Sequence, residues 1–382
     1  MKTIRWLFQL SAVLLSLSHS TLAQSVDDPL PRRAYFGVGL EKAEGGARVF
    51  SVAHDSTAEA LGVVIGDIIE AVDTQSTTSP DSVVSAIGHH RGGETVQIDV
   101  RRAGNLRRIS GTLKTIPLEQ MANATVHYSS VAVQPDVRLR TILSIPPGPP
   151  NSRFPAVMLI QGGGCGSIDS PFSTDVAQPG LIHRIGSQGF ITMRVEKSGV
   201  GDSQGVPCDT IGYKEELAGY QAALAALRSN PAVNQDRIYL LGISLGGVFA
   251  PLLAAETKVA GISVWGTSSV PPPVYPGRSE RFFREFPSVD VAAAWLKANT
   301  RVQVMQGEYD NDPYTNRGRE IIAPLNKLNP GSATFTVLAG LDHCWTRHVS
   351  LEASVDKCGQ GEPSTALIDS ILSFLRSGKA EA

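Results

Sequence analysis

The chain has 382 residues with 34 lysines and arginines, 36 aspartates and glutamates, and a formal net charge of −2. This length exceeds one average domain and suits two, one of them small and the other of roughly 250 residues. The numbers of basic and acidic residues are nearly equal, so the composition does not indicate nucleic-acid binding. No nucleic-acid partner is therefore expected.

The N-terminal segment has the features of a secretory signal peptide. Lys2 and Arg5 precede an apolar run from Trp6 to Leu17, and Thr21-Leu22-Ala23 has the small residues of a cleavage site. The run is too short for a stable membrane span, and no stop-transfer pattern follows it. We expect residues 1–23 to be removed, which deletes two cations and moves the charge from −2 to −4. The protein is therefore predicted to be exported, to the periplasm or as a secreted protein.

A small, strand-rich unit is predicted next. Residues 24–34 are polar and contain Pro29 and Pro31, which predicts a short disordered lead. From Tyr35 the pattern changes to short alternating strands. Strands are expected at 36–40, 47–52, 65–72, 95–101 and 106–113, with helices at 56–62 and 80–88.

Several motifs of this unit resemble a PDZ domain of the type found in exported bacterial high-temperature-requirement proteases. They are the loop Tyr35-Phe36-Gly37-Val38-Gly39-Leu40, the segment 56–62, Gly66-Asp67-Ile68-Ile69, and Gly92-Gly93-Glu94 before Val96-Gln97-Ile98. The resemblance covers residues 35–114. In that family the glycine-containing loop binds the terminal carboxylate of a peptide, which then adds a strand to the sheet edge.

The PDZ resemblance implies a peptide C-terminus as a partner, bound through backbone N–H groups of Phe36, Gly37, Val38, Gly39 and Leu40. The alternative is a module that only packs against its neighbour.

Residues 115–125 are expected to be a linker, and residues 126–378 form a second unit in which strands and helices alternate. Strands are expected at 126–133, 137–145, 156–160, 190–195, 237–241, 261–265, 302–306 and 334–338, and helices near 178–188, 213–229, 245–256, 289–298, 315–328 and 364–377. This order predicts an α/β fold with a mostly parallel sheet and helices on both faces.

The pentapeptide Gly242-Ile243-Ser244-Leu245-Gly246 stands between an expected buried strand and a helix, which is the context of a nucleophile elbow. Glycines two residues before and after the serine are needed because the strand and helix backbones nearly touch there. The turn exposes Ser244 Oγ above the sheet edge, while the Leu245 N–H at the helix start faces a developing oxyanion. Together with the alternating elements, this pattern resembles the α/β-hydrolase fold over about residues 125–378.

The resemblance implies an acid on the loop after a later strand. Asp310, in Gln306-Gly307-Glu308-Tyr309-Asp310, matches the Gly-x-x-Asp position of the family, and Glu308 and Asp312 are its competitors. The acid would accept the Nδ1–H of a catalytic histidine and stabilise the imidazolium.

The histidine position of the family matches His343, which follows the expected strand 334–338, and His348 is its rival. The chain order serine, aspartate, histidine is the order of this fold.

A second oxyanion donor is implied on the loop Gln161-Gly162-Gly163-Gly164-Cys165-Gly166, which resembles the His-Gly-Gly-Gly loop of the family with Gln161 in place of histidine. Because this position differs, the donor is left open between Gly163 and Gly164. A phosphate-binding function is excluded because no Gly-Lys-Ser/Thr follows the loop.

The segment 195–205, which includes Glu196-Lys197-Ser198-Gly199-Val200-Gly201, resembles the Asp-x-Arg-Gly-x-Gly-x-Ser segment that shapes the site rim in the family. The insert between Trp265 and Arg301, rich in proline and aromatic residues, occupies the position of a lid. We expect a short cap over an open pocket, or else a packed connection to the next helix.

The four cysteines are expected to form disulfides, because an exported chain with an even number of cysteines can do so. Three pairings are open. We favour Cys165 with Cys208 and Cys344 with Cys358, since the resemblance to the α/β-hydrolase fold implies that each pair lies on loops at the same rim of the site. The alternative for Cys165 and Cys208 is two free, buried thiols. Neither a C-x-x-C motif nor a histidine-rich spacing indicates a metal site.

These features predict an exported serine hydrolase that cleaves a small-molecule ester, or a thioester, through an acyl-enzyme and without a cofactor or metal. The first alternative is a serine peptidase acting on a peptide substrate docked by the PDZ-like unit. The second is a non-catalytic, PDZ-tethered binding protein.

Overall fold

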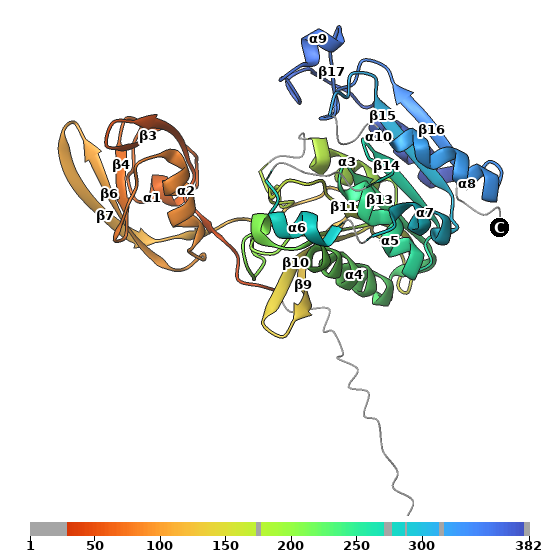
Figure 1. The fold of residues 1–382 in the computed structure, drawn as a ribbon. Coiled ribbons are helices and arrows are strands. Elements are labelled where there is room, and N and C mark those ends of the chain that lie inside the picture. The colour runs from red at the N-terminus through yellow and green to blue at the C-terminus, as the bar shows by residue number, and fades with distance from the viewer. Residues whose placement is uncertain (1–28, 173–176, 271–276, 287–288, 313–316, 378–382) are drawn as a thin grey trace, which may run out of the picture.

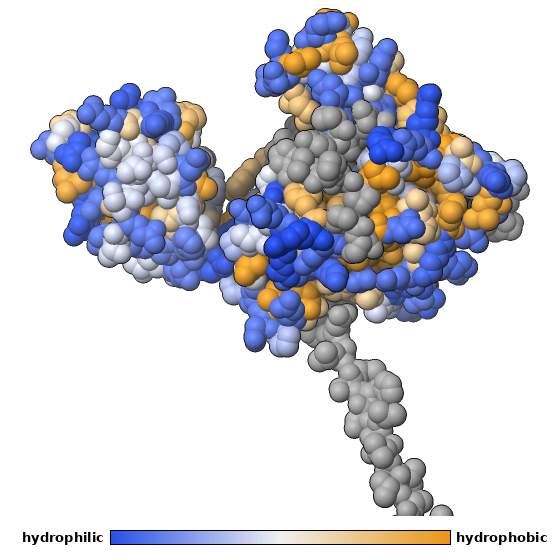
Figure 2. Space-filling view, viewed as in Figure 1, coloured by the Kyte–Doolittle hydropathy of each residue, from blue (hydrophilic) through white to orange (hydrophobic). Residues whose placement is uncertain are grey.

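The computed structural model describes residues 29–172, 177–270, 277–286, 289–312 and 317–377. The signal peptide expected at residues 1–23 lies outside these ranges. Figure 1 shows two units, a small one at the left and a larger one at the right, joined by two chain segments. On the face seen in Figure 2, hydrophilic and hydrophobic residues are interspersed over both units.

The small unit is an antiparallel sheet with two short helices. Its elements are β1 (Ala34–Tyr35), β2 (Val38–Ala43), β3 (Gly46–Val52), α1 (Thr57–Ala60), β4 (Ile68–Val72), β5 (Gln75–Ser76), α2 (Pro80–Gly88), β6 (Thr95–Arg102), β7 (Asn105–Thr112) and β8 (Lys114–Thr115). The sheet order is β2-β3-β4-β6-β7, with β5 paired to β4, so β2 is an edge strand. A separate two-stranded sheet pairs β1 with β8.

The core of this unit follows from the two-residue period of its strands. On β6, Val96, Ile98 and Val100 are buried, and the residues between them are more exposed. Helix α2 begins with a capping box at Ser79 and proline at Pro80, which are signals for a helix start.

The large unit carries the elements β9 (Thr125–Gln134), β10 (Val137–Ile145), β11 (Phe154–Ile160), α3 (Ala177–Ser187), β12 (Ile191–Val195), η1 (Cys208–Thr210), α4 (Tyr213–Ser229), β13 (Val233–Ile243), α5 (Gly246–Glu256), β14 (Gly261–Trp265), α6 (Glu280–Glu285), α7 (Val291–Ala298), β15 (Val302–Gly307), η3 (Gly318–Ile321), α8 (Ile322–Leu328), β16 (Ala333–Leu338), β17 (Thr346–Arg347), α9 (Leu351–Ser354), β18 (Glu362–Pro363) and α10 (Ala366–Ser377). The helix expected at 315–328 is shorter, because 3-10 turns occupy 318–321 and the helix proper begins at Ile322.

Eight strands form one sheet in the order β16-β15-β14-β13-β11-β12-β10-β9. The six strands from β16 to β12 are parallel, and β10 and β9 are antiparallel additions at one edge. Such an arrangement matches the mostly parallel α/β sheet expected from the sequence.

Both faces of this sheet are buried. Side chains of β11 alternate between two cores, since Ala156 and Met158 lie in one and Val157 and Leu159 in the other. Helices α4, α5, α6, α7 and α8 cover the first face, and α3 and α10 cover the second. In the part of the chain that the structure describes, no helix has the length and apolar character of a membrane span.

The expected disordered lead is wrong for residues 30–33. Leu30 is buried, and its carbonyl accepts a hydrogen bond of 2.5 Å from Arg140 of the large unit. Arg32 Nη1 lies 2.5 Å from a carboxylate oxygen of Asp169 and 2.5 Å from one of Asp202. The polar residues and prolines of this segment indicated disorder. The anchoring contacts could not be predicted, because their partners lie far away in the sequence.

The segment expected to be a linker is also anchored. Glu119 is buried, with its carboxylate in a bidentate pair with Arg194 at 2.7 and 2.9 Å. The Ser170 N–H donates to the same carboxylate at 2.7 Å. Burial alone would raise the pKa of Glu119, but contacts with His183 and Arg194 outweigh it and lower the pKa to about 2.

Glu119→Gln should lower the free energy of unfolding by about 3–5 kcal/mol at pH 7, because it leaves the buried Arg194 guanidinium without its charge partner. The depressed pKa means that the stabilisation is present above the ordinary value of 4.5 and is lost as the pH falls towards 2. The difference between the variant and the wild type in urea unfolding should therefore shrink over this range.

Asp369→Asn is the matched control, because Asp369 pairs with Arg184 at 3.0 Å on an exposed surface, where ion pairs contribute little. Equal losses in the two variants would contradict the stabilising role of Glu119.

Candidate active site

Ser244 lies on a tight turn between β13 and α5, as the elbow pattern predicts. Its φ is +53°, a left-handed conformation that is rare for residues other than glycine and persists only where the surroundings impose it. The Ser244 N–H donates to the Trp265 carbonyl at 2.8 Å, and its own carbonyl accepts from Gly247 at 2.9 Å. The serine backbone is thus held from both sides.

The two glycines of the motif permit this turn by close backbone contact. A Cβ at Gly242 would lie 2.7 Å from Gly247 Cα, and one at Gly246 would lie 2.1 Å from the Ile160 carbonyl oxygen. Both contacts are impossible for a real side chain. The end of β11 therefore packs directly on the start of α5.

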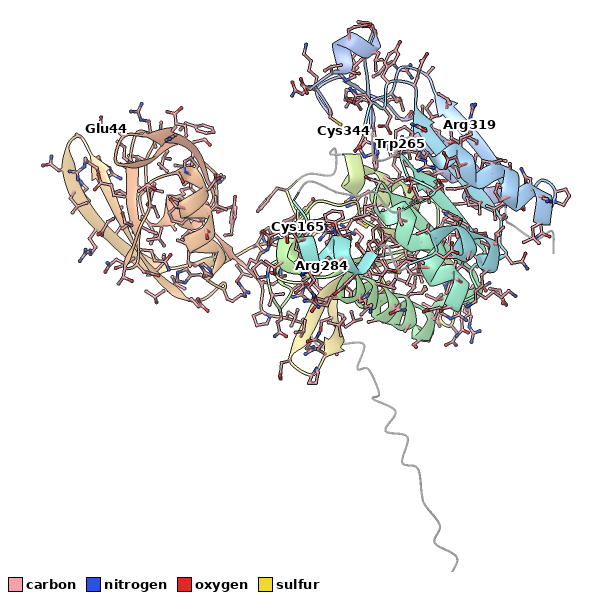
Figure 3. The ribbon with its side chains drawn as sticks, in the orientation of Figure 1. Glu44, Cys165, Trp265, Arg284, Arg319 and Cys344 are labelled. Carbon is pink, nitrogen blue, oxygen red and sulfur yellow. A yellow bond between two sulfur atoms is a disulfide. The ribbon has the colours of Figure 1, made fainter. Side chains whose placement is uncertain are left out.

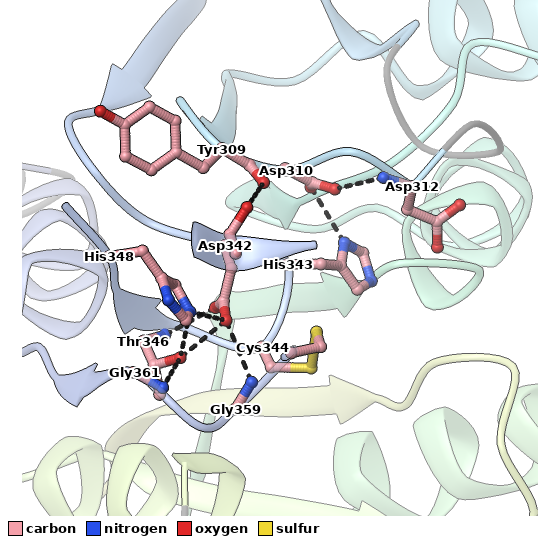
Figure 4. Close-up of a disulfide and its surroundings, with 12 residues drawn as sticks. Tyr309, Asp310, Asp312, Asp342, His343, Cys344, Thr346, His348, Gly359 and Gly361 are labelled. Atoms are coloured by element: carbon pink, nitrogen blue, oxygen red, sulfur yellow. Dashed lines mark hydrogen bonds and ion pairs between the residues drawn. A yellow bond between two sulfur atoms is a disulfide. The ribbon is translucent and has the colours of Figure 1, made fainter. Parts of the chain in front are cut away.

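Asp310 and His343 form a hydrogen-bonded pair, with Asp310 Oδ2 2.9 Å from His343 Nδ1 (Figure 4). The Asp310 carboxylate is buried, and its other oxygen accepts from the Asp312 N–H at 3.2 Å. Burial lowers the pKa of His343, but the hydrogen bond and charge of Asp310, with the charges of Asp312 and Asp342, raise it above the ordinary value of 6.5. The pairing leaves Nε2 as the ring nitrogen that can exchange a proton with a substrate.

The strand β14 links this pair to the serine. The fully buried Trp265 accepts from the Ser244 N–H and donates its indole N–H to the His343 carbonyl at 2.9 Å. A Cβ at Gly266 would lie 2.8 Å from the His343 ring and 2.9 Å from Asp310 Oδ2. The positions of Trp265 and Gly266 in the site were not predicted from the sequence, although their place at the end of β14, beside the strand that leads to Ser244, was a usable signal.

Two of the rival residues, His348 and Glu308, have other partners. His348 Nε2 lies 2.9 Å from Asp342 Oδ2, in a second histidine–aspartate pair that Figure 4 shows beside the first. Asp342 also accepts from the Thr346 N–H and the Gly359 N–H. Glu308 accepts from the Gly340 N–H at 2.8 Å. These contacts hold the loop around His343 in place.

Both disulfides are present in the pairing favoured from the sequence, Cys165–Cys208 and Cys344–Cys358. Cys344 follows His343 directly and lies near Trp265 in Figure 3. Each disulfide therefore closes a loop next to a residue of the candidate site.

The glycine loop lies beside the serine. A Cβ at Gly162 would approach Ser244 Cβ to 3.3 Å and Ser244 Oγ to 3.9 Å. Gly163 and Gly164 follow Gly162, and Leu245 follows Ser244 at the start of α5. The structure thus places the start of the glycine loop next to Ser244.

The lid-like insert is a packed connection over its described part. Phe282 and Phe286 are fully buried, and their rings contact those of Tyr213 and Phe249. Residues 271–276 lie outside the described residues. Phe282 and Phe286 thus belong to the core, which favours the expected packed connection over a lid.

The loop that the sequence predicts to bind a carboxylate precedes the edge strand β2. The Phe36 carbonyl accepts from the Ala58 N–H at 2.9 Å, and Gly37 has a φ of +76°. A Cβ at Gly37 would lie 2.3 Å from Ser56 Cβ. Val38, Gly39 and Leu40 then lie on β2, the edge strand.

Potential metal-ligand atoms of His54, Asp55 and Glu59 lie within 4.8 Å of one another in the small unit, but all three side chains are exposed. They are distant in sequence from the serine, histidine and aspartate of the candidate site.

The PDZ domain family matches residues 34–113. An uncharacterized protein of Pseudomonas aeruginosa is 26% identical over 203 residues, which cover 52% of this chain and 48% of that protein. Esterase EstD of Thermotoga maritima is 28% identical over 120 residues, or 31% of this chain and 28% of that protein. The chain thus spans less than half the length of either relative.

The solved acylaminoacyl peptidase of Pyrococcus horikoshii is similar with a TM-score of 0.56 and 10% identity, covering 92% of this chain and 52% of that one. At this identity the likeness concerns the fold alone. The order of the strands in the sheet and the similarity to this solved structure together define an α/β-hydrolase fold. More particularly, the chain consists of a PDZ domain followed by a unit with the α/β-hydrolase fold. The prediction of both units is confirmed.

Asp310→Asn should lower the pKa of His343, because it removes the hydrogen bond and the negative charge that raise this pKa. NMR titration of the imidazole measures the shift. Asp312→Asn is the control and should shift the pKa less, since the charge of Asp312 raises this pKa less than the hydrogen bond and the charge of Asp310 do. A larger shift in the Asp312 variant would show that the acid is misassigned.

Proposed function

We propose that the protein is an exported serine hydrolase that cleaves ester or thioester bonds through an acyl-enzyme, with Ser244 as nucleophile, His343 as base and Asp310 as its orienting acid. The observation that carries the proposal is the Asp310–His343 pair, linked through Trp265 to the elbow that holds Ser244. The order and spacing of these residues along the fold support the same assignment.

In the proposed reaction, Ser244 Oγ attacks the carbonyl carbon of the substrate while His343 Nε2 takes the hydroxyl proton. Asp310 fixes the tautomer that leaves Nε2 free to accept it and stabilises the imidazolium. The tetrahedral intermediate expels the alcohol or thiol, which receives the proton from His343. Water then attacks the acyl-enzyme by the same steps and releases the acid.

The negative charge of the intermediate would be held by the Leu245 N–H and by an N–H of Gly163 or Gly164. The helix α5 begins at Gly246 and adds the positive end of its dipole to this position.

Export is supported by the signal-peptide pattern of residues 1–23 and by the two disulfides, since disulfides persist in oxidising compartments. The periplasm or the outside of the cell is the proposed location.

Ester cleavage is the first choice because one of the relatives is an esterase by name. The alternative is a peptidase, and the specific observation in its favour is the edge position of β2, which is open to strand addition by a peptide. The PDZ domain would then dock the peptide substrate through its terminal carboxylate.

The mature protein should hydrolyse p-nitrophenyl esters, and Ser244→Ala should abolish turnover and labelling by a fluorophosphonate, which needs an activated serine. Asp310→Asn should lower kcat by roughly 10³–10⁴-fold with the fold intact. Aminoacyl and peptidyl anilides measured in parallel decide between esterase and peptidase. Equal labelling of the wild type and Ser244→Ala would show that another residue is the activated nucleophile. No labelling of either protein would favour a non-catalytic binding protein. Both results would sink the proposal.

A peptide with a free C-terminus should bind the PDZ domain, because the loop before β2 presents backbone N–H groups to a carboxylate. Fluorescence polarisation of a labelled peptide library measures binding. The same peptides with amidated C-termini are the matched controls and should bind at least tenfold more weakly. Equal affinities of the two forms would show that the loop does not bind the terminal carboxylate.

A further inference from the structure

Lys197 is a buried cation beneath the glycine loop of the candidate site. It follows β12, and its side chain is only 1% exposed. Its ammonium group donates to the carbonyls of Gly162 at 2.5 Å and Gly164 at 2.8 Å, and it lies 3.1 Å from Glu216 Oε1. An ammonium has three N–H donors, so these three acceptors satisfy it completely.

The two carbonyl contacts fix the direction of the peptide groups that follow. In a planar trans peptide, the carbonyl of one residue and the N–H of the next point in opposite directions. Because the Gly162 carbonyl faces Lys197, the Gly163 N–H points away from it. The same holds for the Gly164 carbonyl and the Cys165 N–H. The Gly164 N–H belongs to the intervening peptide, which has no contact with the ammonium among the described interactions.

The ammonium belongs to a closed ring of contacts around the loop. Glu216 lies 2.6 Å from Arg278 Nη2, and Arg278 donates to the Cys208 carbonyl at 3.1 Å. The disulfide leads from Cys208 to Cys165, which follows the glycines held by Lys197. The loop is therefore fastened at its carbonyls by a charge and at its end by a covalent bond.

We propose that Lys197 is a positioning residue for the oxyanion hole, and that by holding the carbonyls of Gly162 and Gly164 it selects the Gly163 N–H as the second oxyanion donor. The proposal rests on the serine-hydrolase function proposed above. Lys197 does not touch the substrate. It acts by fixing the direction of the peptide group between Gly162 and Gly163. This role explains why Lys197 is buried at a position of the rim motif where the residue type varies.

Lys197→Met tests the proposal because it keeps the length of the side chain and removes the donors. Glu216 keeps Arg278 and the Tyr220 hydroxyl as partners, at 2.6 and 3.1 Å, so no charge is left unpaired. The matched control is Lys214→Met, which removes an exposed lysine from the start of α4. Wild type, both variants and Ser244→Ala are compared on one p-nitrophenyl ester.

Lys197→Met should lower kcat by about 10²-fold, the effect of losing one oxyanion-hole donor, while KM stays within threefold. The inhibition constant of a trifluoromethyl ketone, which forms a tetrahedral oxyanion on the serine, should rise by a similar factor. A merely structural role would reduce the active fraction and leave this constant unchanged. Lys214→Met should match the wild type in all three measurements.

Lys197→Arg provides a second test on a protein that keeps the buried charge. Burial, opposed by Glu216 and assisted by Arg278, lowers the pKa of Lys197 to about 8. Wild-type kcat should therefore fall as the pH rises through about 8, where the ammonium loses its proton. Arginine stays protonated, so this alkaline fall should be absent from the variant.

Two failures are distinguishable. If Ser244→Ala retains turnover, the proposed function is wrong and the role of Lys197 falls with it. If Ser244→Ala is inactive but Lys197→Met keeps wild-type kcat and ketone affinity, the serine hydrolase stands and the positioning role is overturned. An alkaline fall shared by the wild type and Lys197→Arg would also overturn it.

Discussion

Direct backbone contact between β11, β13 and α5 is the constraint on which the candidate site depends. Glycines at 242 and 246 allow this approach, and the approach forces Ser244 into a left-handed conformation. From that conformation the serine N–H reaches the Trp265 carbonyl, and the Trp265 indole reaches the carbonyl of His343. The positions of Ser244 and His343 are therefore set by one continuous series of contacts, which runs through the Trp265 carbonyl and the Trp265 indole.

Buried charges order the loops that the sheet itself cannot hold. Loops carry backbone polar groups without partners from regular structure, and each such group is costly when buried. Lys197 satisfies two carbonyls of the glycine loop, and Arg194 binds both the Ile168 carbonyl further along that loop and the Glu119 carboxylate. Isolated buried charges are expensive, so each of these cations has an anionic partner. The hydrogen bonds and ion pairs of Lys197 and Arg194 thus hold these loops in defined positions.

The fold was predicted well from local patterns, because the period of a strand or a helix is visible in consecutive residues. The strand and helix periods gave nearly every element of the sheet, and the elbow around Ser244 was visible as a pentapeptide with its flanking strand. Contacts between distant residues could not be read in this way. Trp265 stands at the end of an expected strand and Lys197 lies in the rim motif, but their contacts are made with carbonyls of other loops, which the local pattern does not show. The anchoring of Arg32 was missed for the same reason, since its carboxylate partners lie 137 and 170 residues away.

The pairing of β1 with β8 means that the PDZ domain is attached by a two-stranded ribbon. One strand of this ribbon is fastened at its base through Arg32 and the other through Glu119, both by buried carboxylate pairs. A domain on a single flexible linker can turn about the bonds of that linker. Two segments that pair with each other and are each anchored leave less freedom for such a turn. Anchoring of both segments therefore restricts the rotation of the PDZ domain relative to the large unit more than a single linker would.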